Sequence, residues 1–161
     1  MRKSQITSKE IKGDFEKYES YREAWSRIKQ AQENDFFLEA ITIQESIISD
    51  RLISFLSRPG ICNSFSEERG NTKFISFYKL IKHWRSEFPK GIQSGSYQDL
   101  IGAVDEWRDS RNAAIHAIVK STPEEAVQPI NSFLQEAKKV AEEGGKLARE
   151  VCIWHKREKR K

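Results

Sequence analysis

Apolar side chains recur every three or four residues along most of the chain, which is the spacing of one buried face of an α-helix. Five segments show this spacing, at residues 14–31, 36–56, 72–88, 97–119 and 122–154. No segment shows the strict alternation that is typical of a β-strand. Residues 61–71 and 89–96 are rich in Gly, Asn and Ser and are predicted to be loops. The sequence therefore predicts an all-α fold, a helical bundle of about five helices.

The segment 36–56 is apolar over the largest part of its circumference. One stripe of a helical wheel holds Phe37, Ile41, Ile48, Leu52 and Phe55, and further isoleucines widen it. A helix with so wide an apolar surface is normally buried in the middle of a bundle. We therefore expect this helix to be the central one.

Local signals indicate where the other helices begin and bend. Thr122 and Glu125 are predicted to form a capping box at the start of the last helix. Pro129 and the pair Gly144–Gly145 are expected to kink or weaken the same helix. In the segment 72–88, His83 lies opposite the apolar face and is expected to be exposed.

The composition fits one helical domain with a charged end. The chain has 161 residues, of which 32% are charged and only 8 are Gly and 4 are Pro. The last seven residues, HKREKRK, contain five basic side chains and one acidic side chain. Their local charge of +4 equals the net charge of the whole chain. We expect a single domain over residues 1–154, close to neutral, and a basic tail at 155–161. The tail is either a solvated terminus or an attraction site for RNA.

Several classes of protein are disfavoured by the sequence. No apolar stretch approaches the roughly 18 residues of a membrane span, and the N-terminus lacks an apolar leader. Cys62 and Cys152 form neither a disulfide framework nor a metal-binding spacing. A near-neutral domain also disfavours a DNA-binding helix-turn-helix. We expect a cytoplasmic protein with reduced thiols, without a metal, a cofactor or a membrane partner.

Two arginines interrupt the apolar arc of the segment 97–119. Arg108 and Arg111 occupy positions where a bundle would ordinarily have Leu. Because an arginine keeps its charge, burying it without an anion costs several kcal/mol. Each arginine must therefore reach the edge of the bundle, pair with a carboxylate, or face a cleft that admits an anionic ligand.

A second stripe beside this arc carries Asn112 and His116, which lie one helical turn apart, together with Asp105 and Asp109. A guanidinium binds phosphate through paired hydrogen bonds and opposes charge that grows in a transition state. An imidazole titrates near neutrality and can transfer protons. An arginine, an amide and an imidazole on one rim therefore suit phosphodiester chemistry.

The same residues also have a purely structural interpretation. Arg108 can pair with Asp105 on its own helix, and Arg111 can pair with a carboxylate of another helix. Glu45, near the edge of the apolar stripe of the segment 36–56, is a candidate carboxylate partner for either Arg108 or Arg111. Under this interpretation the arginines hold the bundle together and bind no ligand.

Written out, residues 111–116 are RNAAIH, an arginine and a histidine separated by four residues, with a polar residue directly after the arginine. This segment, late in an all-helical chain, resembles the HEPN superfamily. The resemblance implies an antiparallel HEPN-like bundle that acts as a metal-independent endoribonuclease, commonly as a homodimer. Its expected products are a 2′,3′-cyclic phosphate and a 5′-hydroxyl.

The resemblance also implies roles for individual residues. His116 would take part in general acid–base catalysis, and Arg111 would bind the scissile phosphate and stabilise the transition state. Asn112 would orient the imidazole or bind phosphate. Arg108 and Glu45 are candidates for neighbouring residues that hold these three side chains in position.

Many HEPN proteins are toxins of toxin–antitoxin or phage-defence systems, which implies an antitoxin or regulatory partner protein. In one well-known group a tyrosine lies two residues after the histidine, whereas Ile118 occupies that position here. This departure argues against regulation by modification of that tyrosine. HEPN-like bundles also occur as catalytically inactive scaffolds, so a helical scaffold that binds a protein partner or RNA is the alternative function.

Overall fold

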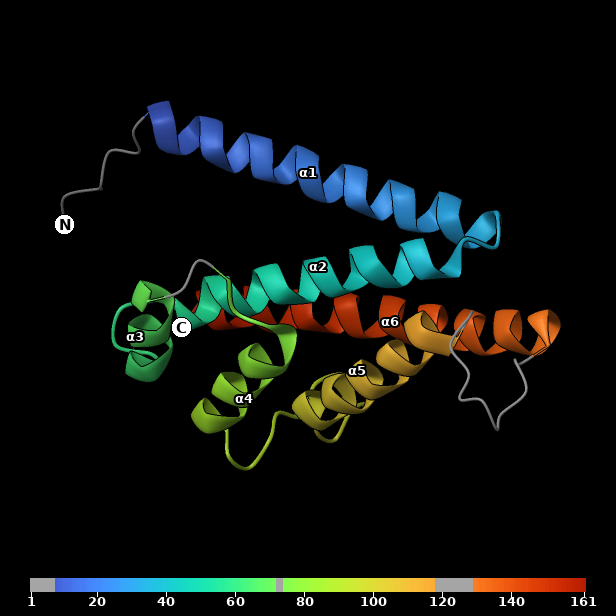
Figure 1. The fold of residues 1–161 in the computed structure, drawn as a ribbon. Coiled ribbons are helices and arrows are strands. Elements are labelled where there is room, and N and C mark those ends of the chain that lie inside the picture. The colour runs from blue at the N-terminus through green and yellow to red at the C-terminus, as the bar shows by residue number, and fades with distance from the viewer. Residues whose placement is uncertain (1–7, 72–73, 118–128) are drawn as a thin grey trace.

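The computed structural model describes residues 8–71, 74–117 and 129–161, with side chains from Asp14 onward except that of Asn71. These ranges form six helices (Figure 1): α1 (Ser8–Glu33), α2 (Phe37–Leu56), α3 (Asn63–Asn71), α4 (Phe77–Glu87), α5 (Leu100–Ala117) and α6 (Ile130–Lys159). No strand occurs among the described residues, and a single isolated bridge joins Ser94 to Tyr97. The predicted all-α class is confirmed, but the described part of the chain has six helices and not five.

The additional helix is α3, and the prediction of a loop at 61–71 was wrong. Its nine residues are mostly polar and show no apolar periodicity. Its Phe65, however, is fully buried and packs edge-on against the imidazole of His83 in α4, with ring centroids 5.6 Å apart. Tertiary packing of one side chain therefore stabilises a helix that local propensity does not predict.

The expectation that His83 is exposed was also wrong. Its side chain is 15% exposed, and its Nε2 lies 2.7 Å from the Glu68 carboxylate of α3. The wheel of α4 could not show this, because the partner helix α3 was itself not predicted.

The predicted central helix is confirmed, since α2 contacts α1, α4, α5 and α6, and its whole predicted stripe is buried. The Gln44 side chain donates to the Ala141 carbonyl of α6, and further along both helices Ser54 and His155 share a hydrogen bond. Because both contacts advance in the same direction, α2 and α6 are parallel. In contrast, α1 and α5 run opposite to them, and α1 diverges from α2 toward its N-terminal end (Figure 1).

An aromatic cluster joins α2, α4 and α6. The ring of Trp154 lies at its centre, 4.9 Å from Phe55 and 5.0 Å from Trp84, measured between ring centroids. The ring of Phe88, directly after α4, is 6.0 Å away. Burying each such side chain contributes roughly 1.5–3 kcal/mol, so this cluster fixes the relative positions of the three helices.

The pair Gly144–Gly145, which was expected to kink or weaken this helix, does not interrupt α6, which is continuous from Ile130 to Lys159. Both glycines are buried where α6 crosses its neighbours. A Cβ atom added to Gly144 would lie 2.6 Å from Cζ2 of Trp107 and against Oε1 of Gln44. Gly144 therefore allows both α2 and α5 to approach α6 closely. Pro129 precedes the first residue of α6 at its N-cap, and Thr122 and Glu125 lie outside the described residues.

The basic C-terminal segment belongs to α6 as far as Lys159. Its first residue, His155, has only 2% of its surface exposed. Burial, together with the nearby cations Arg51, Arg58 and Lys159, lowers the pKa of His155 from its ordinary 6.5 to about 4, and the Asp50 carboxylate opposes part of this shift. The segment 155–161 therefore includes a buried, neutral imidazole as well as solvated cations.

This histidine makes the stability of the fold depend on pH. Because the pKa is lower in the folded chain, the unfolded chain binds the proton more readily between pH 6.5 and about 4. The contribution of His155 is therefore complete above pH 6.5 and is lost as the pH falls to 4, by roughly 3 kcal/mol. Urea unfolding at both pH values should show this loss in the wild type and not in His155→Gln. A His155 imidazole that titrates near 6.5 by NMR would contradict the prediction.

Candidate functional site on helix α5

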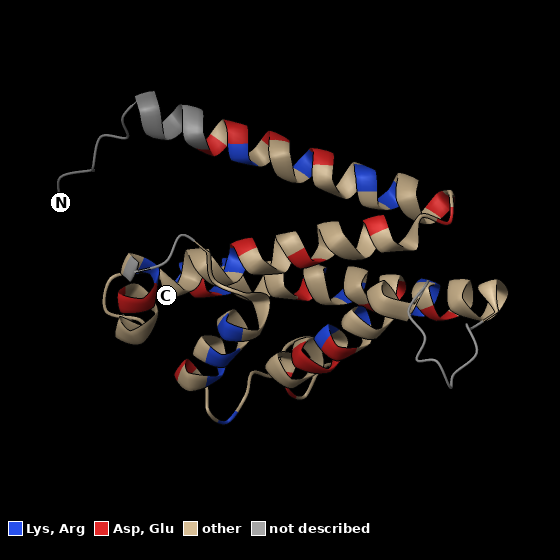
Figure 2. Ribbon diagram, in the orientation of Figure 1, with Lys and Arg blue, Asp and Glu red and all other residues tan. Residues whose placement is uncertain are grey.

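Buried apolar residues fix how α5 is rotated in the bundle. Its face toward the core holds Leu100, Ile101, Val104, Trp107 and Ala114. The Trp107 indole Nε1 also donates a 2.9 Å hydrogen bond to the carbonyl of Val140 in α6. Acidic and basic residues are interspersed along the rest of α5 (Figure 2).

Arg111 is held by two partners at the edge of the core. Its side chain is 25% exposed and forms an ion pair with Glu45 of α2, whose side chain is 19% exposed. Its Nη1 also donates to the Asn112 amide oxygen at 2.6 Å. Of the three arrangements open to this arginine, the structure therefore has the one in which it pairs with a carboxylate.

The surroundings of the Glu45–Arg111 pair do not supply hydrogen-bond partners for all of its polar atoms. Burial raises the pKa of the Glu45 carboxyl above its ordinary value, although the Arg111 guanidinium opposes this shift. The Arg111 Nε atom is buried and has no acceptor among the described residues. A guanidinium has five N–H donors, so Arg111 retains donors for a ligand while it contacts Glu45 and Asn112.

Arg108 is engaged entirely within α4 and α5. Its side chain is 17% exposed and forms ion pairs with Asp105 at 3.0 Å and Asp109 at 3.1 Å. Its guanidinium also lies 4.9 Å from the ring centroid of Tyr78 in α4. With two carboxylates and an aromatic face as partners, Arg108 fastens α5 to α4.

His116 occupies the last turn of α5, one turn beyond Asn112, and is exposed. No hydrogen bond or ion pair to another described residue involves its imidazole. It also forms no hydrogen bond with Arg111, so the structure joins Arg111, Asn112 and Glu45 and leaves His116 outside this set, at the end of the same helix. An exposed imidazole can exchange protons with a bound ligand.

A second polar cluster was missed by the sequence analysis. The Ser64 hydroxyl lies 3.3 Å from Nδ1 of His83, the Cys62 sulfur lies 3.8 Å from the same atom, and Glu68 contacts Nε2. Glu68 also accepts from Lys79 at 2.5 Å. Ser64 and Glu68 are four residues apart, a spacing that would have suggested this cluster if a helix had been expected there. The contacts hold α3 against α4.

Two features are absent from the part of the chain that the structure describes. No group of three or more His, Cys, Asp or Glu side chains there is arranged to hold a metal ion. None of its helices combines the length and the apolar character needed to cross a membrane.

Comparison of the chain with protein-family models, with curated proteins and with solved structures found no match. The resemblance to HEPN proteins therefore rests on the segment 111–116 and on the helices around it.

Proposed function

We propose that the chain is a metal-independent endoribonuclease of the HEPN type, which cleaves RNA to 2′,3′-cyclic phosphate and 5′-hydroxyl ends. The supporting observation is that the last two turns of α5 carry Arg111, bonded to Asn112 and Glu45, beside an exposed His116. This arrangement offers a fixed cation for a phosphate and a proton carrier that solvent can reach.

The chemistry assigns a separate task to each side chain. The ribose 2′-hydroxyl loses its proton and attacks phosphorus, so that the O2′–P bond forms and the P–O5′ bond breaks. His116 accepts or supplies the transferred proton, and Arg111 contacts the phosphate oxygens on which charge grows. Asn112 limits the motion of the guanidinium through the 2.6 Å hydrogen bond. Glu45 positions Arg111 from the side of α2.

A homodimer completes this mechanism. One proton must leave O2′ while another reaches O5′, and each chain supplies a single histidine next to Arg111. Two chains whose α5 helices face one cleft would provide both the acid and the base. A ribonuclease of this kind requires restraint in the cell, so we place it in a toxin–antitoxin or phage-defence setting with an antitoxin or regulatory partner protein.

The test is incubation of the purified chain with total cellular RNA in EDTA, followed by analysis of the new ends. We expect cleavage that persists in EDTA and leaves cyclic phosphates, which resist 3′-end ligation until they are opened. Because total RNA offers nearly every short sequence, a folded chain that creates no new ends would contradict the proposal. Cleavage that stops in EDTA would contradict the metal-independent mechanism.

One observation favours the alternative, a catalytically inactive helical scaffold. The Arg111 charge is already compensated by Glu45, as it would be in an arginine that only joins α2 to α5. The two functions differ in one measurable result, because a scaffold that binds a protein or RNA leaves the RNA intact under the conditions of this test.

A further inference from the structure

Two arginines near the C-terminal end of α2 have no acidic partner. Arg51 and Arg58 are half-buried and form no ion pair with any described residue. The neighbouring Asp50 is already engaged by the Lys17 ammonium at 3.0 Å and the Tyr21 hydroxyl at 2.5 Å. A half-buried guanidinium without an anion is costly, so the pair requires an explanation.

The environment of each guanidinium confirms that donors are left over. The Arg51 guanidinium lies 4.0 Å from the ring centroid of Tyr21, and that of Arg58 lies 5.2 Å from the ring centroid of Phe55. Stacking on a ring leaves the N–H groups in the guanidinium plane available, and Arg51 uses only part of this capacity in a hydrogen bond with the Cys152 thiol. Arg51 Nε and Arg58 Nη2 are both buried without an acceptor in the described ranges.

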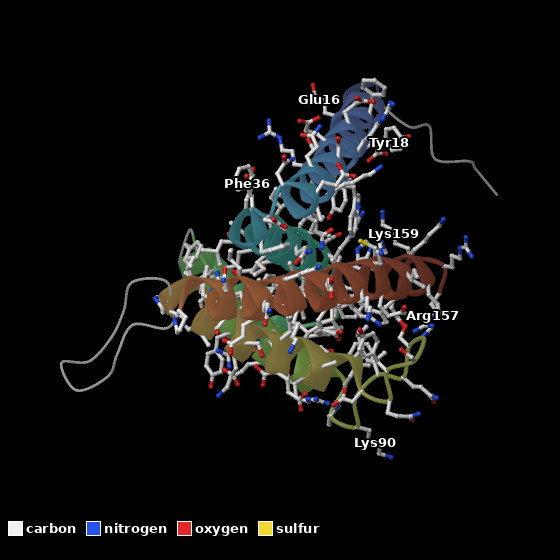
Figure 3. All side chains as sticks on the ribbon, turned by 90° about the vertical axis from the view of Figure 1, so that its right-hand side faces the viewer. Glu16, Tyr18, Phe36, Lys90, Arg157 and Lys159 are labelled. Carbon is white, nitrogen blue, oxygen red and sulfur yellow. The ribbon has the colours of Figure 1, made fainter. Side chains whose placement is uncertain are left out.

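A third cation comes from α6. Lys159 lies one turn after His155 and contributes, with Arg51 and Arg58, to the positive potential at that imidazole. In Figure 3, Lys159 projects from the C-terminal end of α6 on the side of α1, and Arg157 projects on the opposite side, where it bonds to Ser94. Three cations, from α2, from the residues just after it and from α6, therefore act on one buried, neutral histidine, and Asp50 opposes them.

The helix dipoles explain only part of this arrangement. Lys159 is the last residue of α6 and Arg58 follows the end of α2, where cations compensate the partial negative charge of a helix C-terminus. Arg51 lies more than one turn before the end of α2, beyond the range of that effect. Its charge therefore points to an external anion.

We propose that Arg51, Arg58 and Lys159 form a phosphate-binding site for the backbone of an RNA strand, separate from the site on α5. The inference rests on the proposed function for the identity of the ligand. Arg51 lies in α2 and Arg58 lies two residues after its last residue, so the two arginines offer successive positive charges along the chain. A nucleic-acid strand repeats its charge along a line. The exposed Lys156 and Arg160 extend the basic surface in solvent.

The inference is tested by binding, without cleavage, of a fluorescent RNA of about 12 nucleotides whose 2′-hydroxyls are methylated. The variant Arg58→Gln/Lys159→Gln is compared with Lys138→Gln/Lys139→Gln. The control removes the same charge from two exposed lysines in the N-terminal half of α6. We expect the first variant to lose about tenfold in affinity and to lower the salt slope by about 1.4, the value for two lost single-strand contacts. We expect the control to stay within twofold of the wild type.

The outcomes separate this inference from the proposed function. Equal losses in the two double variants, or no loss in either, would overturn the site. Lys159→Gln alone, at an exposed position that leaves the fold intact, should show about half of the effect on the salt slope. Displacement of the RNA by millimolar inorganic phosphate at matched ionic strength would indicate a small-anion site and overturn the RNA assignment. If RNA binding depends on Arg58 and Lys159 but the chain cleaves no RNA, the binding site is supported and the proposed ribonuclease function is contradicted.

Discussion

Replacing His116 by Ala is expected to slow RNA cleavage by about 10² to 10⁴-fold, which is the usual contribution of a general acid–base group. The side chain is exposed and has no partner among the described residues, so its removal should leave the thermal stability unchanged. A loss of rate without a loss of stability would assign the effect to proton transfer. The measurement is single-turnover cleavage of one RNA that the wild type cuts, together with a melting curve.

The Arg111 variants complete this first prediction. Arg111→Lys keeps the positive charge but loses the planar pair of donors, so it should lose about 10² to 10³-fold in rate. Arg27→Ala is a matched control, because Arg27 also pairs with a glutamate, Glu23, but on the outside of α1. The control should cleave at the wild-type rate. Cleavage that survives in both His116→Ala and Arg111→Lys would show that the catalytic site lies elsewhere.

Replacing Gly144 by Ala is expected to destabilise the fold by about 2 kcal/mol, although alanine is the better helix former by about 1 kcal/mol. The new methyl group would lie 2.6 Å from Cζ2 of Trp107 and would collide with the Gln44 amide oxygen. Moving Gln44 away breaks its 2.8 Å hydrogen bond to the Ala141 carbonyl inside the core. Urea unfolding at neutral pH measures the change in the free energy of unfolding.

The adjacent glycine is the control for this second prediction. A Cβ atom on Gly145 would lie 3.6 Å from the Gln44 amide nitrogen, an ordinary contact distance. Gly145→Ala should therefore be neutral or stabilise the fold by up to about 1 kcal/mol through helix propensity. If the two variants had equal stability, the close crossing at Gly144 would be wrong.

The sequence predicted the features of this fold that depend on periodicity within one helix. The stripe of α2 from Phe37 to Phe55 repeats over five turns, and its position in the middle of the bundle followed from it. The helix α3 was missed because the residues that anchor it, Phe65 and Glu68 among them, have their partners in another helix. Gly144 was misinterpreted for a similar reason, since its role depends on Trp107 and Gln44.

The candidate sites also combine features that the sequence predicts with features that only the packed helices show. The spacing of Arg111 and His116 is visible in the chain, and the position of Glu45 near the edge of its apolar stripe made it a candidate partner for Arg108 or Arg111. The lack of a carboxylate at Arg51 could not be predicted. It depends on Asp50 being engaged by Lys17 and Tyr21 of α1, an arrangement that exists only once the helices are packed.

The aromatic cluster gives the chain a built-in optical signal. Three of the four tryptophans of the chain, Trp84, Trp107 and Trp154, are at most 2% exposed. Their fluorescence emission should therefore be blue-shifted and resistant to aqueous quenchers in the native state. Trp84 and Trp154 lie close enough for their transitions to couple. Trp107 reports separately on the junction of α5 with α6. Changes beside the catalytic candidates and changes in the core can therefore be followed in the unlabelled protein.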